Sequence, residues 1–206
     1  MPSPSATHHV VRTGGAVQPF RPWSQRSAGP GEVLDRLPGT TSRRAVAEVL
    51  TEIVETEGPV PFSRLARLAA GAFGVDGTGE DRRRPILRCL PERFRDEPGR
   101  DRVAWPSDTD PRAWAVHRAS TPDQRTLSDI PLREVGNAMH ALAVCSSGLD
   151  RAELFRATLA EFGMTDRADR AERLQEAALL AVEDGRIRTD EGMYVAGAAP
   201  AFRRQG

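Results

Sequence analysis

Apolar residues recur at helical spacing along much of the chain. The stretch GPVPFSRLARLAAGAFGV, residues 58–75, places six apolar side chains on one side of a helix: Phe62, Leu65, Ala66, Leu68, Ala69 and Phe73. Arg64 and Arg67 fall on the other side. Such a basic amphipathic helix fits either a membrane surface or a packed domain. The pattern elsewhere in the chain decides between the two.

The same pattern returns 89 positions later. Five apolar positions of the first copy, Val46, Val49, Leu50, Ile53 and Val54, correspond to Val135, Ala138, Met139, Leu142 and Ala143. Phe73-Gly74 matches Phe162-Gly163, and each glycine suits the left-handed position that ends a helix. The sequence therefore contains an internal repeat.

Each copy is predicted to contain three helices followed by an extended segment. In the second copy, GRIRTDEGMYVA alternates in polarity around an Asp-Glu-Gly turn, which indicates a β-hairpin. In the first copy the corresponding strand is DRVAW. Three helices and a hairpin form a winged helix, a variant of helix-turn-helix. The predicted fold is mainly α with small β-wings, in two tandem winged-helix-like domains, and residues 62–73 pack against neighbouring helices rather than on lipid.

The breaks in the pattern predict the domain boundaries. Pro, Gly and Ser enrich the first residues, and three prolines lie in WPSDTDPRAWAVHRASTPDQR. We expect a mostly disordered arm at 1–40, a first winged-helix-like domain at 41–107, a linker at 108–127, a second such domain at 128–196 and a loose tail at 197–206.

No apolar run approaches the roughly 18 residues that span a bilayer, and the N-terminal residues lack the apolar core of a signal peptide. We therefore expect a cytoplasmic protein without a membrane partner. All 29 basic residues are arginine, which excludes mechanisms that need a lysine. The histidines lack metal-ligand spacing and no catalytic grouping emerges, so we expect neither enzymatic activity nor a cofactor nor a metal.

The net charge of zero hides an uneven distribution. Residues 81–102 hold eight arginines and five acids, whereas residues 128–196 hold eight arginines and thirteen acids. A predicted helix from about Arg82 to Leu90, capped by Asp81, occupies the place of the helix that enters the DNA major groove. Its arginines and those just after it are the candidate nucleic-acid-binding residues: Arg82, Arg83, Arg84, Arg88, Arg93 and Arg95. Arg84 and Arg88 are expected to share its outward face.

The equivalent helix of the second copy, about 166–183, is acidic and is expected to contact protein. Asp166 precedes Arg170 by four residues and Asp169 precedes Arg173 by four, a spacing that favours internal ion pairs. Arg186 and Arg188 of the hairpin are the local basic exceptions. The alternative for the first copy is that its arginines form a solvated face paired with nearby acids.

The combination of EGPV, FGV, AWP and NAM, over roughly residues 20–195, resembles the C-terminal region of large bacterial superfamily 1 helicase-related proteins, which contains domain of unknown function 3320. The helicase motifs and nuclease residues of those proteins are absent here. The resemblance implies a detached accessory module and carries over no catalytic residue.

These observations predict a non-catalytic accessory module of helicase-type DNA transactions that binds nucleic acid weakly through its first domain. The expected partners are DNA and a helicase or nuclease protein. The alternative is a protein–protein interaction scaffold that does not bind nucleic acid.

Overall fold

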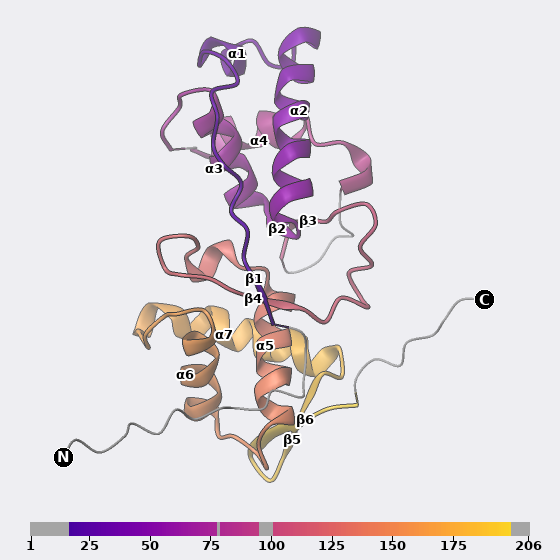
Figure 1. Cartoon of the computed structure of the whole chain (residues 1–206), viewed down its shortest axis with the longest axis vertical. Coiled ribbons are helices and arrows are strands. Elements are labelled where there is room, and N and C mark those ends of the chain that lie inside the picture. Colours follow the sequence, from indigo (N-terminus) through magenta and orange to yellow (C-terminus); the bar gives the residue numbers. More distant parts are fainter. Residues whose placement is uncertain (1–16, 78, 95–100, 199–206) are drawn as a thin grey trace, which may run out of the picture.

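The computed structural model describes residues 17–77, 79–94 and 101–198. Within them the chain is built mainly from helices, with three two-stranded sheets. Figure 1 shows the helices in two groups, one above the other along the longest axis of the molecule. We call residues 32–94 the first group and residues 132–196 the second group. The prediction of a mainly α chain with small β elements is confirmed.

The first group surrounds one apolar core. Its elements are α1 (Glu32–Asp35), α2 (Thr40–Glu57), β2 (Val60–Pro61), α3 (Phe62–Ala72), α4 (Glu80–Leu87) and the 3-10 turn η1 (Glu92–Phe94). The apolar stripe of α2 supplies the centre of this core, and Leu50 and Ile53 are fully buried there. β2 pairs antiparallel with β3 (Val103–Ala104), which closes the first group from below in Figure 1.

The second group has a separate apolar core. Its elements are α5 (Leu132–Val144), α6 (Arg151–Glu161), η3 (Ala168–Arg170), α7 (Ala171–Glu183), β5 (Ile187–Asp190) and β6 (Met193–Ala196). Asp150 and Glu153 form a capping box that starts α6. α5 packs closely on α7, because a Cβ at Gly136 would lie 3.1 Å from that of Ala181.

The hairpin predicted in the second copy is present. β5 and β6 pair antiparallel from Ile187↔Ala196 to Asp190↔Met193. The two turn residues, Glu191 and Gly192, both have positive φ, 49° and 83°, as a type I′ turn requires. β3 lies within the DRVAW strand predicted for the first copy.

The repeat is visible in the positions of the helices. α3 covers residues 62–72 and α6 covers residues 151–161, so both bounds differ by the same 89 positions as the sequence repeat. Phe73 and Phe162 are the C-cap residues, with exposed fractions of 1% and 0%. Gly74 and Gly163 follow them with φ of 72° and 67°. Both copies thus end their middle helix in the same way.

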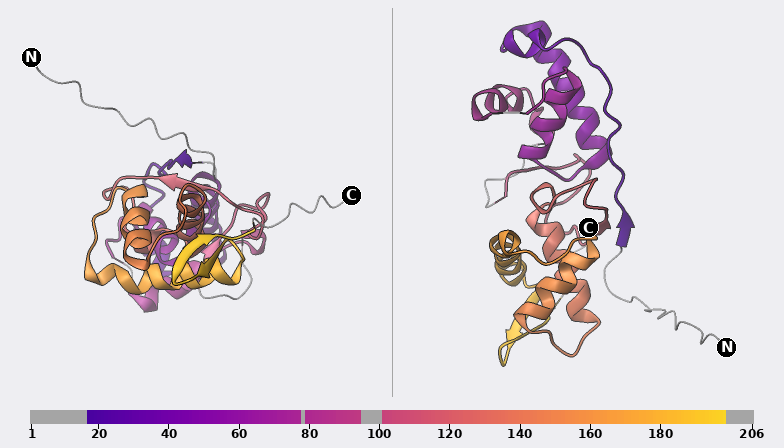
Figure 2. Two further views of the ribbon diagram at one scale, coloured as in Figure 1. Left: turned by 90° about the horizontal axis from the view of Figure 1, so that it is seen from below. Right: turned by 90° about the vertical axis from the view of Figure 1, so that its left-hand side faces the viewer.

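The N-terminal segment is more ordered than the predicted arm. β1 (Val17–Pro19) pairs in parallel with β4 (His117–Ala119), and Figure 2 shows the chain then running along one side of the first group to α1. Phe20 and Trp23 are buried. Their burial explains the order of residues 17–40, whereas residues 1–16 lie outside the described part of the chain.

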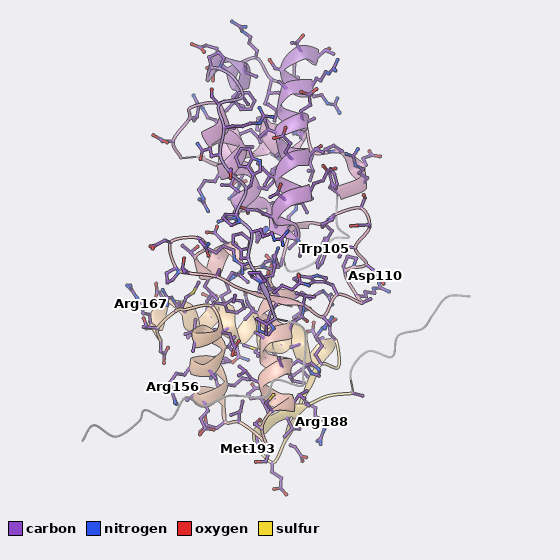
Figure 3. All side chains as sticks on the ribbon, in the orientation of Figure 1. Trp105, Asp110, Arg156, Arg167, Arg188 and Met193 are labelled. Carbon is purple, nitrogen blue, oxygen red and sulfur yellow. The ribbon has the colours of Figure 1, made fainter. Side chains whose placement is uncertain are left out.

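The segment 108–127, which the sequence predicts to be a linker, is partly buried. It contains β4 and three buried polar residues, His117, Arg118 and Arg125. Just before it, Trp105 lies between the two groups (Figure 3) and meets the edge of the Trp114 ring, with ring centroids 5.5 Å apart. The two groups meet in a region that we call the junction. It comprises β1, residues 20–23, β4, residues 120–129 and the facing ends of α2 and α3.

Candidate nucleic-acid interface

α4 carries three of the six arginines that the sequence predicts to bind nucleic acid, and a fourth, Arg88, is its C-cap residue. Gly79 is its N-cap, so the predicted cap at Asp81 is wrong. Glu80 and Asp81 instead lie in the first turn, where carboxylates interact favourably with the helix dipole. The helix ends at Leu87, three residues earlier than predicted. Pro85 has no N–H to donate to the Asp81 carbonyl, which weakens the last turn.

Two arginines occupy the outer side of this region. Ile86 and Leu90 face the core and are 1% and 2% exposed. Arg84 and Arg88, four residues apart, are both exposed, and this spacing places them on one side of the chain. Arg84 forms no ion pair with any other residue that the structure describes. Its guanidinium therefore keeps all of its donors for a ligand.

Three of the six candidates, Arg82, Arg83 and Arg93, lie close to acidic side chains. Arg82 lies 3.5 Å from Asp35 and is 51% exposed. Arg83 pairs with Glu80. Arg93 lies 3.8 Å from Glu55, and its guanidinium lies 4.4 Å from the ring centre of Phe94. Arg95 lies outside the described residues. The structure thus brings Arg82, Arg83, Arg84 and Arg88 together. The exposure of Arg84 and Arg88 fits a basic binding face, whereas the ion pairs of Arg82 and Arg83 fit the alternative of a solvated face paired with acids.

The second group presents fewer free arginines than its sequence suggests. α7 begins at Ala171 after the 3-10 turn η3, so the predicted Asp166–Arg170 and Asp169–Arg173 pairs do not form. Arg173 instead donates to the carbonyls of Leu127 and Ile130, at 2.9 and 2.5 Å.

Of the hairpin arginines, Arg186 is only 2% exposed and donates to the Trp114 carbonyl at 3.0 Å. Arg188 is exposed and pairs with Asp190 at 2.8 Å. Figure 3 shows Arg188 near Met193, at the end of the molecule far from α4. The hairpin therefore does not extend the basic surface of α4.

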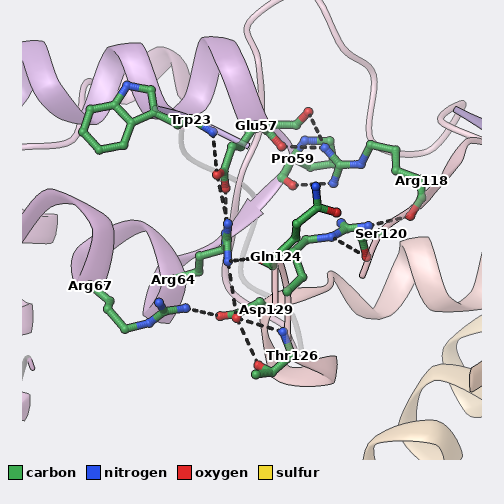
Figure 4. A network of polar contacts seen from close by, with 12 residues as sticks. Trp23, Glu57, Pro59, Arg64, Arg67, Arg118, Ser120, Gln124, Thr126 and Asp129 are labelled. Carbon is green, nitrogen blue, oxygen red and sulfur yellow. Dashed lines mark hydrogen bonds and ion pairs between the residues drawn. The ribbon is translucent and has the colours of Figure 1, made fainter. Parts of the chain in front are cut away.

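A feature that the sequence did not predict is a network of buried charges at the junction (Figure 4). Arg64 donates from Nε to Glu57 Oε2 at 2.6 Å and from Nη2 to Glu57 Oε1 at 2.9 Å. The backbone N–H of Trp23 donates to the same carboxylate at 2.8 Å. Arg64 also lies 3.3 Å from Asp129, which accepts a hydrogen bond of 2.6 Å from Arg67. α3 is thereby tied to the turn η2 (Leu127–Asp129).

The second part of this network is centred on Glu134, which is fully buried. Arg118 donates to its two oxygens at 3.2 and 2.5 Å, and Arg125 Nη1 donates to them at 3.0 and 3.1 Å. The guanidinium of Arg118 also donates to the backbone carbonyls of residues 57–59, at 2.5, 3.1 and 3.0 Å. One side chain of β4 therefore links α5 to the end of α2.

The pKa values of Glu134, Asp129 and Arg125 are shifted by their surroundings in the network. Burial alone would raise the pKa of Glu134, but Arg118 and Arg125 outweigh it and lower that pKa. The pKa of Asp129 is also lowered: hydrogen bonds from Thr126 and the charge of Arg67 overcome burial. Burial lowers the pKa of Arg125 to about 10, despite Glu134. All of these groups are therefore charged at neutral pH.

Phe20 fills the space between three of these guanidinium groups. The Cζ atom of Arg125 lies 4.0 Å from its ring centre, and those of Arg64 and Arg118 each lie 5.4 Å away. Cations are attracted to aromatic faces, and Phe20 N–H donates to the Ala119 carbonyl at 2.9 Å. The N-terminal segment is thus anchored at the point where the two groups meet.

The described residues contain no group of three His, Cys, Asp or Glu side chains arranged to hold a metal ion. His117 contacts Glu161 through Nε2 at 3.2 Å, and His140 Nδ1 contacts the Arg186 carbonyl at 2.6 Å. In the same part of the chain, every helix is too short or too polar to cross a bilayer.

A comparison with models of protein families gives a match to part of the chain. The model of a family described as "Protein of unknown function (DUF3320)" matches residues 35–84. This range contains α2 and α3 and ends at Arg84 in α4; it leaves out most of the junction and the whole second group. No curated protein and no solved structure matches the chain. The domain of unknown function that the sequence resembles is therefore supported for the first group.

Proposed function

We propose that this protein is a non-catalytic accessory module that binds nucleic acid weakly through α4. The observation that carries the proposal is the position of Arg84 in α4 and of Arg88 at its C-cap, both exposed, on the helix that follows α2 and α3. In helix-turn-helix proteins, the corresponding helix contacts the major groove and the phosphates beside it. Arg82 and Arg83 flank this surface and add positive charge.

The proposal includes two tandem winged-helix-like domains, at 41–107 and 128–196. In their favour are the two separate cores and the same order of helices in both copies. A further similarity between the two copies supports this architecture: Val60 pairs with Ala104 in the first copy, and Leu149 forms a bridge to Tyr194 in the second. Each middle helix is thus preceded by a residue that pairs with the extended segment at the end of its copy.

The proposed binding is weak, because few arginines take part. With about three or four phosphate contacts, a dissociation constant in the micromolar range or weaker is expected at physiological salt. Such an affinity suits a module that acts beside another protein in the cytoplasm. The resemblance to the C-terminal region of helicase-related proteins favours a helicase or a nuclease as that protein.

A binding titration tests the proposal. Fluorescence anisotropy with labelled duplex and single-stranded DNA would compare the wild type with an Arg84→Ala, Arg88→Ala double variant. We expect at least about a tenfold loss of affinity, since each lost contact is a charge-assisted hydrogen bond. An Arg156→Ala, Arg167→Ala variant is the matched control: it removes the same charge from exposed positions of the second group (Figure 3). Equal losses in both variants would contradict the proposal.

A second candidate function is a protein–protein scaffold, and α7 supplies the observation in its favour. Leu179 and Val182 are 44% and 39% exposed on that helix. Glu172 and Glu176 are exposed on the same helix. Residues 128–196 carry five more acids than arginines, thirteen against eight, so this face would repel DNA. If no nucleic acid binds at low salt, the scaffold function replaces the first proposal.

A further inference from the structure

A pocket of about 430 Å³ opens at the junction, between α3, α4 and residues 122–129. Its lining holds four arginines and two aspartates: Arg64, Arg67, Arg83, Arg125, Asp123 and Asp129. The lining is therefore positive by two charges. It joins Arg83 of α4 to the buried network, and so connects the proposed nucleic-acid surface with the contact between the two groups.

Two arginines of this pocket, Arg67 and Arg83, have N–H donors that their acidic partners do not occupy. Arg67 is 49% exposed and donates from one nitrogen, Nη2, to Asp129. Its Nε and Nη1 groups have no partner in the described part of the chain. Arg83 is 36% exposed, and its pair with Glu80 also uses Nη2. Both guanidinium groups can therefore turn N–H donors toward a ligand.

Hydroxyl groups complete the set of donors. The side chain of Ser63, which lines the pocket, forms no hydrogen bond with the described residues. Thr126 and Ser128 line it as well. Thr126 donates its hydroxyl to Asp129 at 3.0 Å, and the Ser128 oxygen lies 2.9 Å from that of Thr126, so Ser128 supplies the donor from this turn. Donors thus approach from α3, from α4 and from the turn before α5. A ligand with several acceptor oxygens pointing in different directions fits such an arrangement.

The acidic groups of the pocket leave it open to an anion. Asp129 is held by Arg64 and Arg67 and by the Thr126 N–H at 3.1 Å, so its charge is compensated. Asp123 is exposed to solvent, which screens its charge. Arg83 and Arg125 pair with Glu80 and Glu134, which lie outside the lining, so an anion would be held mainly by the unused N–H donors of Arg67 and Arg83.

We propose that this pocket binds a terminal phosphate group, that is, a phosphate monoester at the end of a nucleic-acid strand or on a nucleotide. Guanidinium groups bind phosphate oxygens in pairs, and a monoester offers three free oxygens and close to two negative charges at neutral pH. A continuous duplex is too wide to enter a pocket of this volume, whereas a terminal phosphate can. As a strand-end site, the pocket rests on the proposed function, because α4 would hold the adjoining nucleotides.

The test compares two short single strands of one sequence, one with a 5′-phosphate and one with a 5′-hydroxyl, by fluorescence anisotropy at low salt. We expect about tenfold tighter binding of the phosphorylated strand, the effect of one well-made charged contact. An Arg67→Gln, Ser63→Ala variant should lose this preference but still bind both strands. The Arg84→Ala, Arg88→Ala variant should bind both more weakly and keep the preference.

A single Ser63→Ala variant, which leaves the ion pairs intact, guards against loss of folding and should reduce the preference partly. Titration with adenosine monophosphate and with inorganic phosphate, followed by NMR at the amides of Ser63, Thr126 and Ser128, shows whether the pocket binds a small ligand or only the phosphate at the end of a strand. Shifts with the nucleotide but no strand binding would keep the pocket and contradict the proposed function. Equal binding of both strands, without any such shifts, would overturn the pocket and leave the proposed function standing.

Discussion

Arg118 of β4 and Glu134 of α5 form a buried ion pair at the centre of the molecule, with Nη2 and Oε2 separated by 2.5 Å. The same guanidinium holds three backbone carbonyls at the end of α2. Glu134 is in turn shared with Arg125. This pair is therefore one of the links that fix the second group to the first, and it carries the first prediction.

Replacing Glu134 by alanine should destabilise the protein strongly. The substitution leaves Arg118 and Arg125 as buried charges without their carboxylate, and breaking a buried pair in this way costs about 3–5 kcal/mol. Urea unfolding at neutral pH, followed by circular dichroism, measures the change. Arg156→Ala on the exposed side of α6 should change the free energy of unfolding by less than about 0.5 kcal/mol. Similar small effects of both substitutions would show that the network does not stabilise the junction.

The stability should also fall at acid pH. The pKa values of Glu134 and Asp129 are lowered in the folded protein, whereas in the unfolded chain they lie near 4. The unfolded state therefore binds more protons as the pH falls, and the free energy of unfolding decreases below about pH 5. Urea midpoints measured from pH 7 to pH 3 follow this loss. An Asp129→Asn variant should start from a lower stability and show a shallower decrease; a decrease as steep as that of the wild type would count against Asp129.

Phe20 anchors the N-terminal segment, so its removal should act on the whole junction. Phe20→Ala empties a site that is 6% exposed, and substitutions of this kind cost about 3 kcal/mol or more. Phe20→Leu keeps most of the volume but loses the aromatic face beside three guanidinium groups, and should cost about 1 kcal/mol. Urea unfolding gives both values. Gln18→Ala, at an exposed position of β1 two residues before Phe20, is the control and should have little effect.

Local patterns in the sequence predicted a large part of the fold. The helices α3 and α6, their Phe-Gly ends and the β5–β6 hairpin each leave a signal within a dozen residues: an apolar stripe, a C-terminal glycine or a turn between alternating residues. The bounds of α4 were less predictable, because Gly79 rather than Asp81 caps it and Pro85 shortens it. The exposure of Arg84 and Arg88 follows from helical spacing alone.

The junction could not be predicted, because its contacts join residues far apart in the chain. Arg118 meets the carbonyls of residues 57–59, and Phe20 meets Arg125. The local sequence around an arginine in a Pro-rich stretch is the same whether the side chain is solvated or buried, because its burial depends on an acidic partner elsewhere in the chain. The sequence pattern therefore predicts an arm at residues 17–23 and a linker at 117–125, although both contain buried side chains.

The salt dependence of DNA binding by the wild type and by the Arg84→Ala, Arg88→Ala variant tests the central claim most directly. With three or four phosphate contacts, the logarithm of the association constant should fall against the logarithm of salt concentration with a slope of about −3. Loss of two contacts should make this slope shallower by nearly 2, while the Arg156→Ala, Arg167→Ala control keeps the slope of the wild type. Identical slopes in all three proteins, or no binding by the wild type at low salt, would contradict binding through α4.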